Sequence, residues 1–277
     1  MTDSIAMTRR SFGALTLGTV AACGPRIPVS NPDDLVVPQL PVFDAGYEPL
    51  FDAGYNLPGI TSDFTVGVNR RMSGMYLGEA PFNSIDVDPY AKFLYHIKED
   101  GSTTRYPIGV GRAGRSFSGN GIIKLKKKWP GWTPTQNMLR TEPDVYGPFR
   151  RGIPGGLLSP LGARALYLFR NGRDTFYRIH GTNDLGSIGN SGSAGCIRMF
   201  NQDIIHLYDE VEIGIKVHVR SEAESLRVDP ENFGRGIELP ARRVDPDEIY
   251  GPDANTQPPD FDAVDPNSLT AEDFVPL

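Results

Sequence analysis

Two side chains that can work together as nucleophile and base, His180 and Cys196, stand sixteen residues apart. The segment between them is rich in glycine, serine and asparagine and is too irregular for a helix. Residues 175–179, just before His180, are mostly β-branched or aromatic, which is typical of a strand. A strand end and a loop would therefore bring an imidazole and a thiol to one place, as a cysteine nucleophile and its base require.

Two other interpretations of this pair stay open on the residues alone. A single cysteine is more often a small buried apolar residue than a reagent. A zinc site could use His180, Cys196 and His206, but zinc sites usually draw on closely spaced cysteine and histidine pairs, and this part of the chain has no second thiol. We therefore expect no metal, and the surrounding sequence has to decide between a catalytic and a structural thiol.

The string around the pair favours catalysis. It contains H-G-T from residue 180, I-G from residue 188 and S-A-G-C-I-R-M over residues 193–199, and it resembles the signature of the L,D-transpeptidase (YkuD) family. The resemblance extends over about residues 82–219, half of the chain. It implies a mainly β domain with short helices, a β-sandwich or partly open barrel of mixed sheets, and it implies no cofactor.

The resemblance also implies a reaction, peptidoglycan L,D-transpeptidation. Cys196 would attack the peptide bond after the L-centre of diaminopimelate in a tetrapeptide stem, form a thioester and release D-alanine. His180 would carry the proton, oriented by the backbone carbonyl of Gly181, and its imidazolium would lower the pKa of the thiol to roughly 3.5–7.5. An amine of another stem peptide would then resolve the thioester into a 3→3 cross-link.

Other outcomes stay open on this sequence. A protein amine, for example on an outer-membrane protein, would attach that protein to the wall, and water as acceptor would make the chain an L,D-carboxypeptidase. A generic cysteine peptidase would instead cleave ordinary L,L-peptides. The rival class without catalysis is a peptidoglycan-binding lipoprotein that keeps the fold.

Further site residues follow from the same resemblance. Backbone N–H groups around Ala194, Gly195 and Cys196 would stabilise the oxyanion, each contributing ~3 kcal/mol, with Ser193 beside them. Many relatives have serine or histidine at the position of Ala194, so this chain lacks a side-chain donor there, and its acceptor choice or rate can differ. Arg198 would pair with a substrate carboxylate or brace the loop.

Both tryptophans of the chain lie in one short segment, K-W-P-G-W-T-P over residues 128–134. A similar segment occurs in some Gram-negative members of the family. Trp129 and Trp132 would form an exposed wall of the substrate site, or they would pack under a loop. Residues 135–156 are loop-like and could form a lid.

The N-terminus predicts export. T-R-R-S-F over residues 8–12 resembles a twin-arginine signal, and the apolar run 12–22 has 11 residues, whereas a permanent membrane span needs about 20. V-A-A-C over residues 20–23 resembles a lipobox, which makes 1–23 the export signal and Cys23 the lipidated residue. An ordinary signal peptide cut near Ala22 is the alternative. The expected location is the bacterial periplasm, with membrane anchoring through Cys23. Catalysis is then the simplest reason for an unpaired Cys196 in an oxidising compartment.

Charge and composition define the rest of the chain. The net charge of −6 argues against a nucleic-acid partner. Residues 221–277 hold 14 acids and 4 bases (−10), so residues 1–220 hold 20 acids and 24 bases (+4). Residues 24–81 are proline-rich, with F-D-A-G-Y at 43–47 repeated at 51–55, and we expect an extended tether, unless its aromatic residues dock on the domain. We expect the acidic tail 220–277 to be mostly disordered.

Local patterns predict the elements of the domain. Strand composition occurs near residues 84–87, 92–97, 103–108, 121–127 and 216–219. Residues 160–168 resemble the N-P-L-G-x-x-A-L-Y-L strand of the family, with Ser159 where asparagine is common. Asn201 is a suitable N-cap for a helix with one apolar stripe, and His206 falls away from that stripe, on the surface. G-V-G-R-A-G over residues 109–114 matches a dinucleotide-binding fingerprint, but neither a helical pattern nor a suitably placed acid follows it, so we reject that function.

Overall fold

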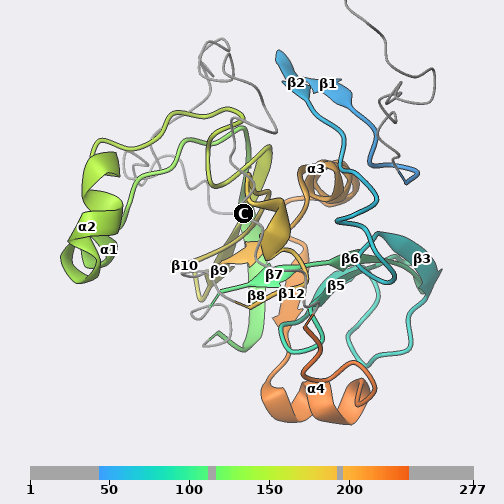
Figure 1. Ribbon diagram of the computed structural model, residues 1–277. Coiled ribbons are helices and arrows are strands. Elements are labelled where there is room, and N and C mark those ends of the chain that lie inside the picture. Colours follow the sequence, from blue (N-terminus) through green and yellow to red (C-terminus); the bar gives the residue numbers. More distant parts are fainter. Residues whose placement is uncertain (1–43, 112–116, 192–195, 237–277) are drawn as a thin grey trace, which may run out of the picture. The chain divides into compact units, whose positions relative to one another are not determined.

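A ten-stranded mixed sheet carries the part of the chain that the structure describes. The computed structural model describes residues 44–111, 117–191 and 196–236 (Figure 1). The strands of this sheet are β3 (Met72–Met75), β4 (Ser84–Asp88), β5 (Phe93–Ile97), β6 (Ser102–Pro107), β7 (Gly109–Val110), β8 (Gly119–Lys128), β9 (Arg164–Arg170), β10 (Arg173–His180), β11 (Ile197–Arg198) and β12 (Lys216–Val219). They pair in the order β3-β6-β5-β4-β12-β8-β9-β10-β11-β7. The β4–β12 and β10–β11 pairs are parallel, and the other pairs are antiparallel.

The order of the strands forces the sheet to curl back on itself. Strands β6 and β7 are separated only by Ile108, yet they take the second and tenth places in the sheet. In a flat sheet, with ~4.8 Å between neighbouring strands, these two would lie about 38 Å apart. One residue spans at most about 3.6 Å. The expected mainly β domain with short helices, arranged as a partly open barrel of mixed strands, is therefore confirmed.

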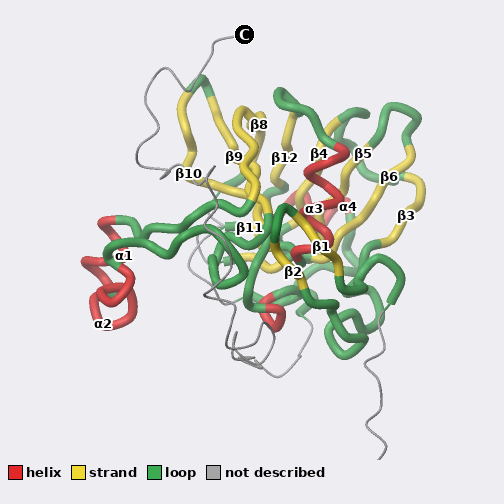
Figure 2. The backbone as a smooth tube through the Cα atoms, turned by 90° about the horizontal axis from the view of Figure 1, so that it is seen from above, coloured by secondary structure: helices red, strands yellow, loops and turns green. Residues whose placement is uncertain are grey.

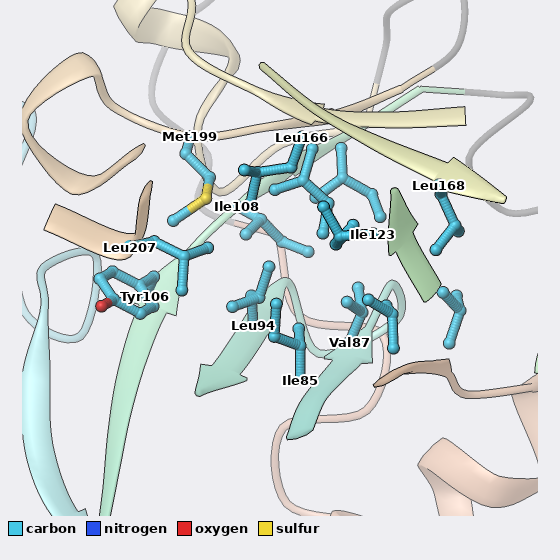
Figure 3. Packing of buried hydrophobic residues seen from close by; sticks show 14 of the residues in the cluster. Ile85, Val87, Leu94, Tyr106, Ile108, Ile123, Leu166, Leu168, Met199 and Leu207 are labelled. Atoms are coloured by element: carbon cyan, nitrogen blue, oxygen red, sulfur yellow. The ribbon is translucent and has the colours of Figure 1, made fainter. Parts of the chain in front are cut away.

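One apolar core fills the inside of the curled sheet. Fully buried side chains from opposite parts of the sheet meet there with those of helix α3 (Asn201–Glu210), among them Leu94 from β5, Leu166 from β9 and Leu207 (Figure 3). Burying one such side chain contributes about 1.5–3 kcal/mol. Because every strand from β4 to β12 supplies residues to this cluster, the core fixes the strand ends that carry the candidate site.

The predicted strands agree with the structure, while several predictions about single residues do not. Helix α3 begins at Asn201 itself, and its N-cap is Phe200, because the Asn201 side chain is buried and bonds elsewhere. His206 is partly buried rather than on the surface, and its Nδ1 lies 2.8 Å from the Tyr106 hydroxyl. The expected loop over 135–156 contains short helices.

Those short helices are α1 (Gln136–Thr141), α2 (Pro143–Tyr146) and the 3-10 turn η2 (Gly147–Phe149). None of them buries a side chain fully. Both views show α1 and α2 extending away from the sheet (Figures 1 and 2). Thr135 caps α1 by accepting a hydrogen bond from the Met138 backbone N–H at 3.2 Å.

The prediction of an extended tether over 24–81 is wrong for residues 44–81. Strands β1 (Leu50–Asp52) and β2 (Tyr55–Leu57) form a hairpin that lies beside α3 (Figures 1 and 2), and β3 is an edge strand of the main sheet. The two tyrosines of the repeated F-D-A-G-Y motif, Tyr47 and Tyr55, are both buried. The Tyr47 ring packs edge-on against Phe200 at 5.8 Å. Docking of these aromatics, the alternative interpretation, is what the structure shows.

Asp52 of the second repeat is joined to the sheet by polar contacts. It accepts hydrogen bonds from both terminal nitrogens of Arg164, at 2.7 and 2.6 Å, and from Trp129 Nε1 at 2.7 Å. These bonds hold the pKa of Asp52 below its ordinary value, although burial acts in the opposite direction. The hairpin is therefore attached by apolar packing and by a charged contact that is mostly shielded from water.

The beginning of the acidic tail also differs from the expected disorder. Residues 220–236 contain helix α4 (Glu222–Val228), which starts with a capping box between Ser221 and Glu224. Arg220 is buried and donates to Asp86 at 2.5 Å and to Asp88 at 2.8 Å. Residues 237–277 and the predicted export signal 1–23, with Cys23, lie outside the described residues. In the described part of the chain, no helix combines the length and apolar character that a membrane span requires.

Candidate active site

His180 is the last residue of β10, and its ring orientation is fixed by the chain itself. Its Nδ1 lies 2.5 Å from the backbone oxygen of Gly181. A carbonyl only accepts hydrogen bonds, so Nδ1 carries the proton and Nε2 keeps a free lone pair. The side chain is 4% exposed. His180 is therefore held in the tautomer that a general base at Nε2 requires.

Asn201 holds the backbone around this histidine, and the sequence analysis missed that role. Its Oδ1 accepts from the Ala163 backbone N–H at 2.9 Å, and its Nδ2 donates to the Thr182 carbonyl at 3.0 Å. A Cβ atom at Gly181 would collide with the Asn201 side-chain oxygen, so only glycine fits there. The only signal in the sequence was a polar residue at the start of a helix, which equally suits an N-cap.

The pairing of β10 with β11 brings the predicted nucleophile beside the strand that ends in the base. The strands run parallel, with Ile179 opposite Ile197 and His180 opposite Arg198. Both isoleucines point into the apolar core. Since side chains alternate along a strand, His180 and Arg198 lie on the opposite face, and Cys196 directly precedes β11.

The thiol of Cys196 is partly exposed and points toward the backbone of β10. Its Sγ donates to the carbonyl oxygen of Phe176 over 4.0 Å. Among the described residues, no hydrogen bond joins Sγ to the ring of His180. In enzymes without substrate such bonds are often long or poorly aligned and tighten in the complex.

The charge state of the pair differs from the sequence expectation. Burial, together with the nearby positive charges of Arg198 and Arg178, lowers the pKa of His180 to about 3, against the effect of its bond to Gly181. Burial also raises the pKa of the Cys196 thiol, although Arg178 and Arg198 act in the opposite direction. The expected imidazolium that lowers the thiol pKa is therefore wrong for this state, because the low-dielectric surroundings disfavour both charges. Burial therefore favours the neutral forms of both groups.

Two arginines flank the sulfur, one from each strand. Arg198 pairs with Asp184 at 3.3 Å, just before the 3-10 turn η3 (Leu185–Ser187), so it braces this loop. Arg178 forms a two-pronged pair with Asp174 at 2.7 Å and lies over the ring of Tyr167 at 4.2 Å. Arg178 was not among the predicted site residues, because a charged residue within a strand is usually a solvated position.

The two tryptophans lie in different environments. Trp129 is 1% exposed, stacks against Tyr55 with 4.4 Å between ring centroids and donates its Nε1–H to Asp52. The prediction that Trp129 forms an exposed wall is therefore wrong, because the docked hairpin covers it. Trp132 is partly buried, pairs with the Ile153 backbone and lies 6.1 Å from the ring of Tyr146, so its role in substrate binding stays a prediction.

The remaining predicted residues are not all covered by the structure. Ser193, Ala194 and Gly195, the predicted oxyanion loop, lie outside the described residues, so their roles stay predictions. Within the described ranges, no group of three or more histidine, cysteine, aspartate or glutamate side chains is arranged to hold a metal ion. His206, the third ligand of the alternative zinc site, bonds to Tyr106.

Known proteins share the region that carries this site. Residues 83–219 match the L,D-transpeptidase catalytic domain of the YkuD family. The chain is 44% identical to Putative L,D-transpeptidase YkuD of Bacillus subtilis (strain 168) over 175 residues, which are 60% of this chain and 94% of that protein. It is 35% identical to Probable L,D-transpeptidase ErfK/SrfK of Escherichia coli (strain K12) over 141 residues, 50% of this chain.

The matches cover different shares of this chain and of the related proteins. The chain spans only 44% of the length of ErfK/SrfK. A crystal structure of a probable carnitine operon oxidoreductase from Brucella melitensis is 39% identical, and the match covers 55% of this chain and 94% of that one. The TM-score between the two structures is 0.40.

Proposed function

The chain belongs to the L,D-transpeptidase (YkuD) family, and from that membership we propose that it is a peptidoglycan L,D-transpeptidase with Cys196 as nucleophile. The observation that carries the proposal is the parallel pairing of β10 and β11, which places His180 opposite Arg198 and brings Cys196, directly before β11, beside β10. The Gly181 carbonyl leaves Nε2 of His180 free to accept a proton. This combination has a use in acyl transfer and none in packing.

The first half of the reaction forms a thioester. His180 Nε2 takes the thiol proton as Cys196 Sγ attacks the carbonyl carbon after the L-centre of diaminopimelate in a tetrapeptide stem. The proton then passes from His180 to the leaving amine, and D-alanine departs. A neutral resting pair suits this order, because the proton moves while the new bond forms and no buried ion pair has to be maintained beforehand. Backbone N–H groups at 194–196 would stabilise the oxyanion.

The second half transfers the acyl group to an acceptor. The amine of a second stem peptide attacks the thioester, His180 accepts its proton and returns it to sulfur, and a 3→3 cross-link results. A protein amine would instead attach an outer-membrane protein to the wall, and water would give an L,D-carboxypeptidase. Arg198 is available to a substrate carboxylate only if it exchanges or shares its partner Asp184.

The proposed location is the periplasm, with the chain anchored to a membrane through lipidated Cys23. The support is the sequence alone: a twin-arginine-like stretch, a short apolar run and V-A-A-C over residues 20–23. A non-catalytic wall-binding lipoprotein is the second candidate for the whole chain.

Muropeptide products test the proposal directly. The purified protein is incubated with muropeptides that carry tetrapeptide stems, and the products are read by mass spectrometry, with Cys196→Ala as the control. Cross-linked dimers that have lost one D-alanine mean transpeptidation, and tripeptides mean hydrolysis. Unchanged substrate with both proteins would favour the non-catalytic lipoprotein and reject the proposal.

A further inference from the structure

Strand β10 is irregular immediately beside the nucleophile. Its pairing with β9 shifts register between Asp174 and Arg178, which marks a bulge. Phe176, inside this bulge, has a φ of +62°. Bulky residues rarely adopt this left-handed backbone conformation, which persists only where the surroundings enforce it.

Packing of the Phe176 ring does not explain the strained backbone. The side chain is 76% exposed and belongs to none of the apolar clusters of the described residues. A residue held in an unfavourable conformation without buried contacts is being used for its backbone groups. The contacts of the Phe176 backbone N–H and carbonyl groups therefore explain its conformation.

Two side chains of the bulge hold its shape. Asp174 Oδ1 accepts the Phe176 backbone N–H at 2.8 Å, which closes a local turn. Thr175 Oγ1 accepts the Tyr177 N–H at 3.2 Å and donates to the Leu168 carbonyl on β9 at 2.5 Å. These bonds replace the ladder contacts that the bulge interrupts.

The backbone groups of the bulge meet the sulfur. The Phe176 carbonyl accepts the Cys196 thiol over 4.0 Å. Backbone hydrogen bonding from Arg178 opposes the effect of burial and lowers the pKa of the thiol. The Phe176 carbonyl therefore suits the protonated sulfur, and the Arg178 amide suits the thiolate.

We propose that residues 174–178 form a cradle that holds the Cys196 sulfur between the Phe176 carbonyl and the Arg178 amide, with Asp174 as its positioning residue. The thiol proton has an acceptor before the reaction, and the sulfur keeps a donor when its proton leaves for His180. The inference rests on the proposed role of Cys196 as the nucleophile.

Several charged or titratable groups also face this sulfur. They are Asp174 and Arg178 on β10, Arg198 on β11 and Tyr167 on β9. A test of the cradle must therefore change the backbone turn while the two variants that are compared carry the same charges. The chain offers two such matched pairs of substitutions.

The first pair is Asp174→Ala and Asp174→Asn. Both remove the negative charge that pairs with Arg178, but only asparagine keeps an oxygen that accepts the Phe176 N–H. Alkylation of Cys196 in the full chain by iodoacetamide is followed against pH, with peptide mass spectrometry separating Cys196 from Cys23. We expect Asp174→Ala to react about tenfold more slowly at pH 8 than Asp174→Asn, the factor that one lost hydrogen bond of ~1.4 kcal/mol gives.

The same pair separates positioning from stability. In Asp174→Ala the kcat for D-alanine release should fall about tenfold with little change in KM, since the sulfur rather than substrate binding is disturbed. If the alanine and asparagine variants have the same alkylation profile, the turn does not position the sulfur and the proposal is overturned. Alkylation needs no peptidoglycan, so this outcome is independent of the proposed transpeptidation.

The second pair, Phe176→Gly and Phe176→Val, tests the strained backbone if the Asp174 variants fold poorly. Glycine adopts a positive φ freely, whereas valine disfavours it. We expect wild-type alkylation of Cys196 in Phe176→Gly and the slow profile in Phe176→Val. The reverse order would show that the ring, and not the backbone, acts on the thiol, and it would overturn the proposal.

Discussion

Asp52 gives the sharpest test of whether the segment before the matched region is part of the folded domain. Asp52→Ala removes two hydrogen bonds to Arg164, a residue 2% exposed, and one to Trp129 Nε1. Removing one partner of a buried ion pair costs about 3–5 kcal/mol, and an unpaired buried N–H costs about 1–3 kcal/mol more. The Asp52 side chain is 15% exposed, so water can replace part of this contact. We therefore expect a loss of about 3 kcal/mol, toward the lower end of these ranges.

The matched control is Asp44→Ala, at the equivalent position of the repeated motif. Asp44 bonds to Thr65 and lies 3.6 Å from Arg70, and the side chains of this ion pair are 29% and 47% exposed. Exposed pairs contribute about 0–1 kcal/mol, and one hydrogen bond adds about 1 kcal/mol. Asp44→Ala should therefore cost about 1 kcal/mol.

Thermal and urea unfolding of the purified chain measure the difference. At about 2–4 °C per kcal/mol, Asp52→Ala should lower Tm by about 6–12 °C, and Asp44→Ala by about 2–4 °C. The urea midpoint should fall in the same order without a change of slope. Equal shifts for the two variants would refute the reasoning, because they would mean that Arg164 and Trp129 do not depend on the docked hairpin.

Three more predictions follow from buried polar groups. Burial raises the pKa of Asp203 from 3.8 to about 7, so the folded state holds a proton that the unfolded state releases, and stability should fall as pH rises from about 4 to 7. The free energy of unfolding should fall by at most ~1.4 kcal/mol per pH unit. Urea titrations at several pH values should show a smaller dependence on pH in Asp203→Asn. An unchanged dependence would contradict the raised pKa of Asp203. Because burial raises the pKa of the Cys196 thiol, its alkylation rate should keep rising through pH 9; a plateau between pH 5 and 8 would indicate an ion pair with His180. Asn201→Ala should lower stability by about 2 kcal/mol and kcat more than KM, and unchanged kinetics would show that Gly181 is positioned without it.

Much of the fold follows from local pattern. Runs of β-branched and aromatic residues marked six strands of the sheet, and the H-G-T and S-A-G-C-I-R-M strings marked the elements that carry the site. These predictions hold because strand composition and turn residues act over a few positions. The order of strands in the sheet does not follow from such patterns, since it depends on contacts between distant segments.

The wrong predictions share one cause, a partner far away in the sequence. Proline-rich residues 24–81 suggested a tether because nothing local shows that Tyr55 meets Trp129, 74 positions further on. For the same reason the sequence left open whether Trp129 is exposed or packed under a loop, and the hairpin covers it. Asp52 and Arg164 are 112 positions apart, so their ion pair was equally invisible.

The charge state of His180 and Cys196 could not be predicted from local sequence patterns either. A cysteine near a histidine suggested an ion pair, but the balance depends on how deeply each group is buried. Burial and two neighbouring arginines decide that balance for His180. Both depend on the tertiary fold, which places the end of β10 beside the start of β9 and the loop after β8.

The central claim, that Cys196 carries the acyl group, is tested most directly by the mass of the intact protein. The full chain is mixed with a tetrapeptide donor in the absence of an acceptor amine, quenched in acid and compared with Cys196→Ala. The account predicts an added mass equal to the donor less D-alanine, located on the peptide that contains Cys196 and removed by hydroxylamine. D-alanine release by Cys196→Ala at the wild-type rate, or an adduct on another residue, would contradict it.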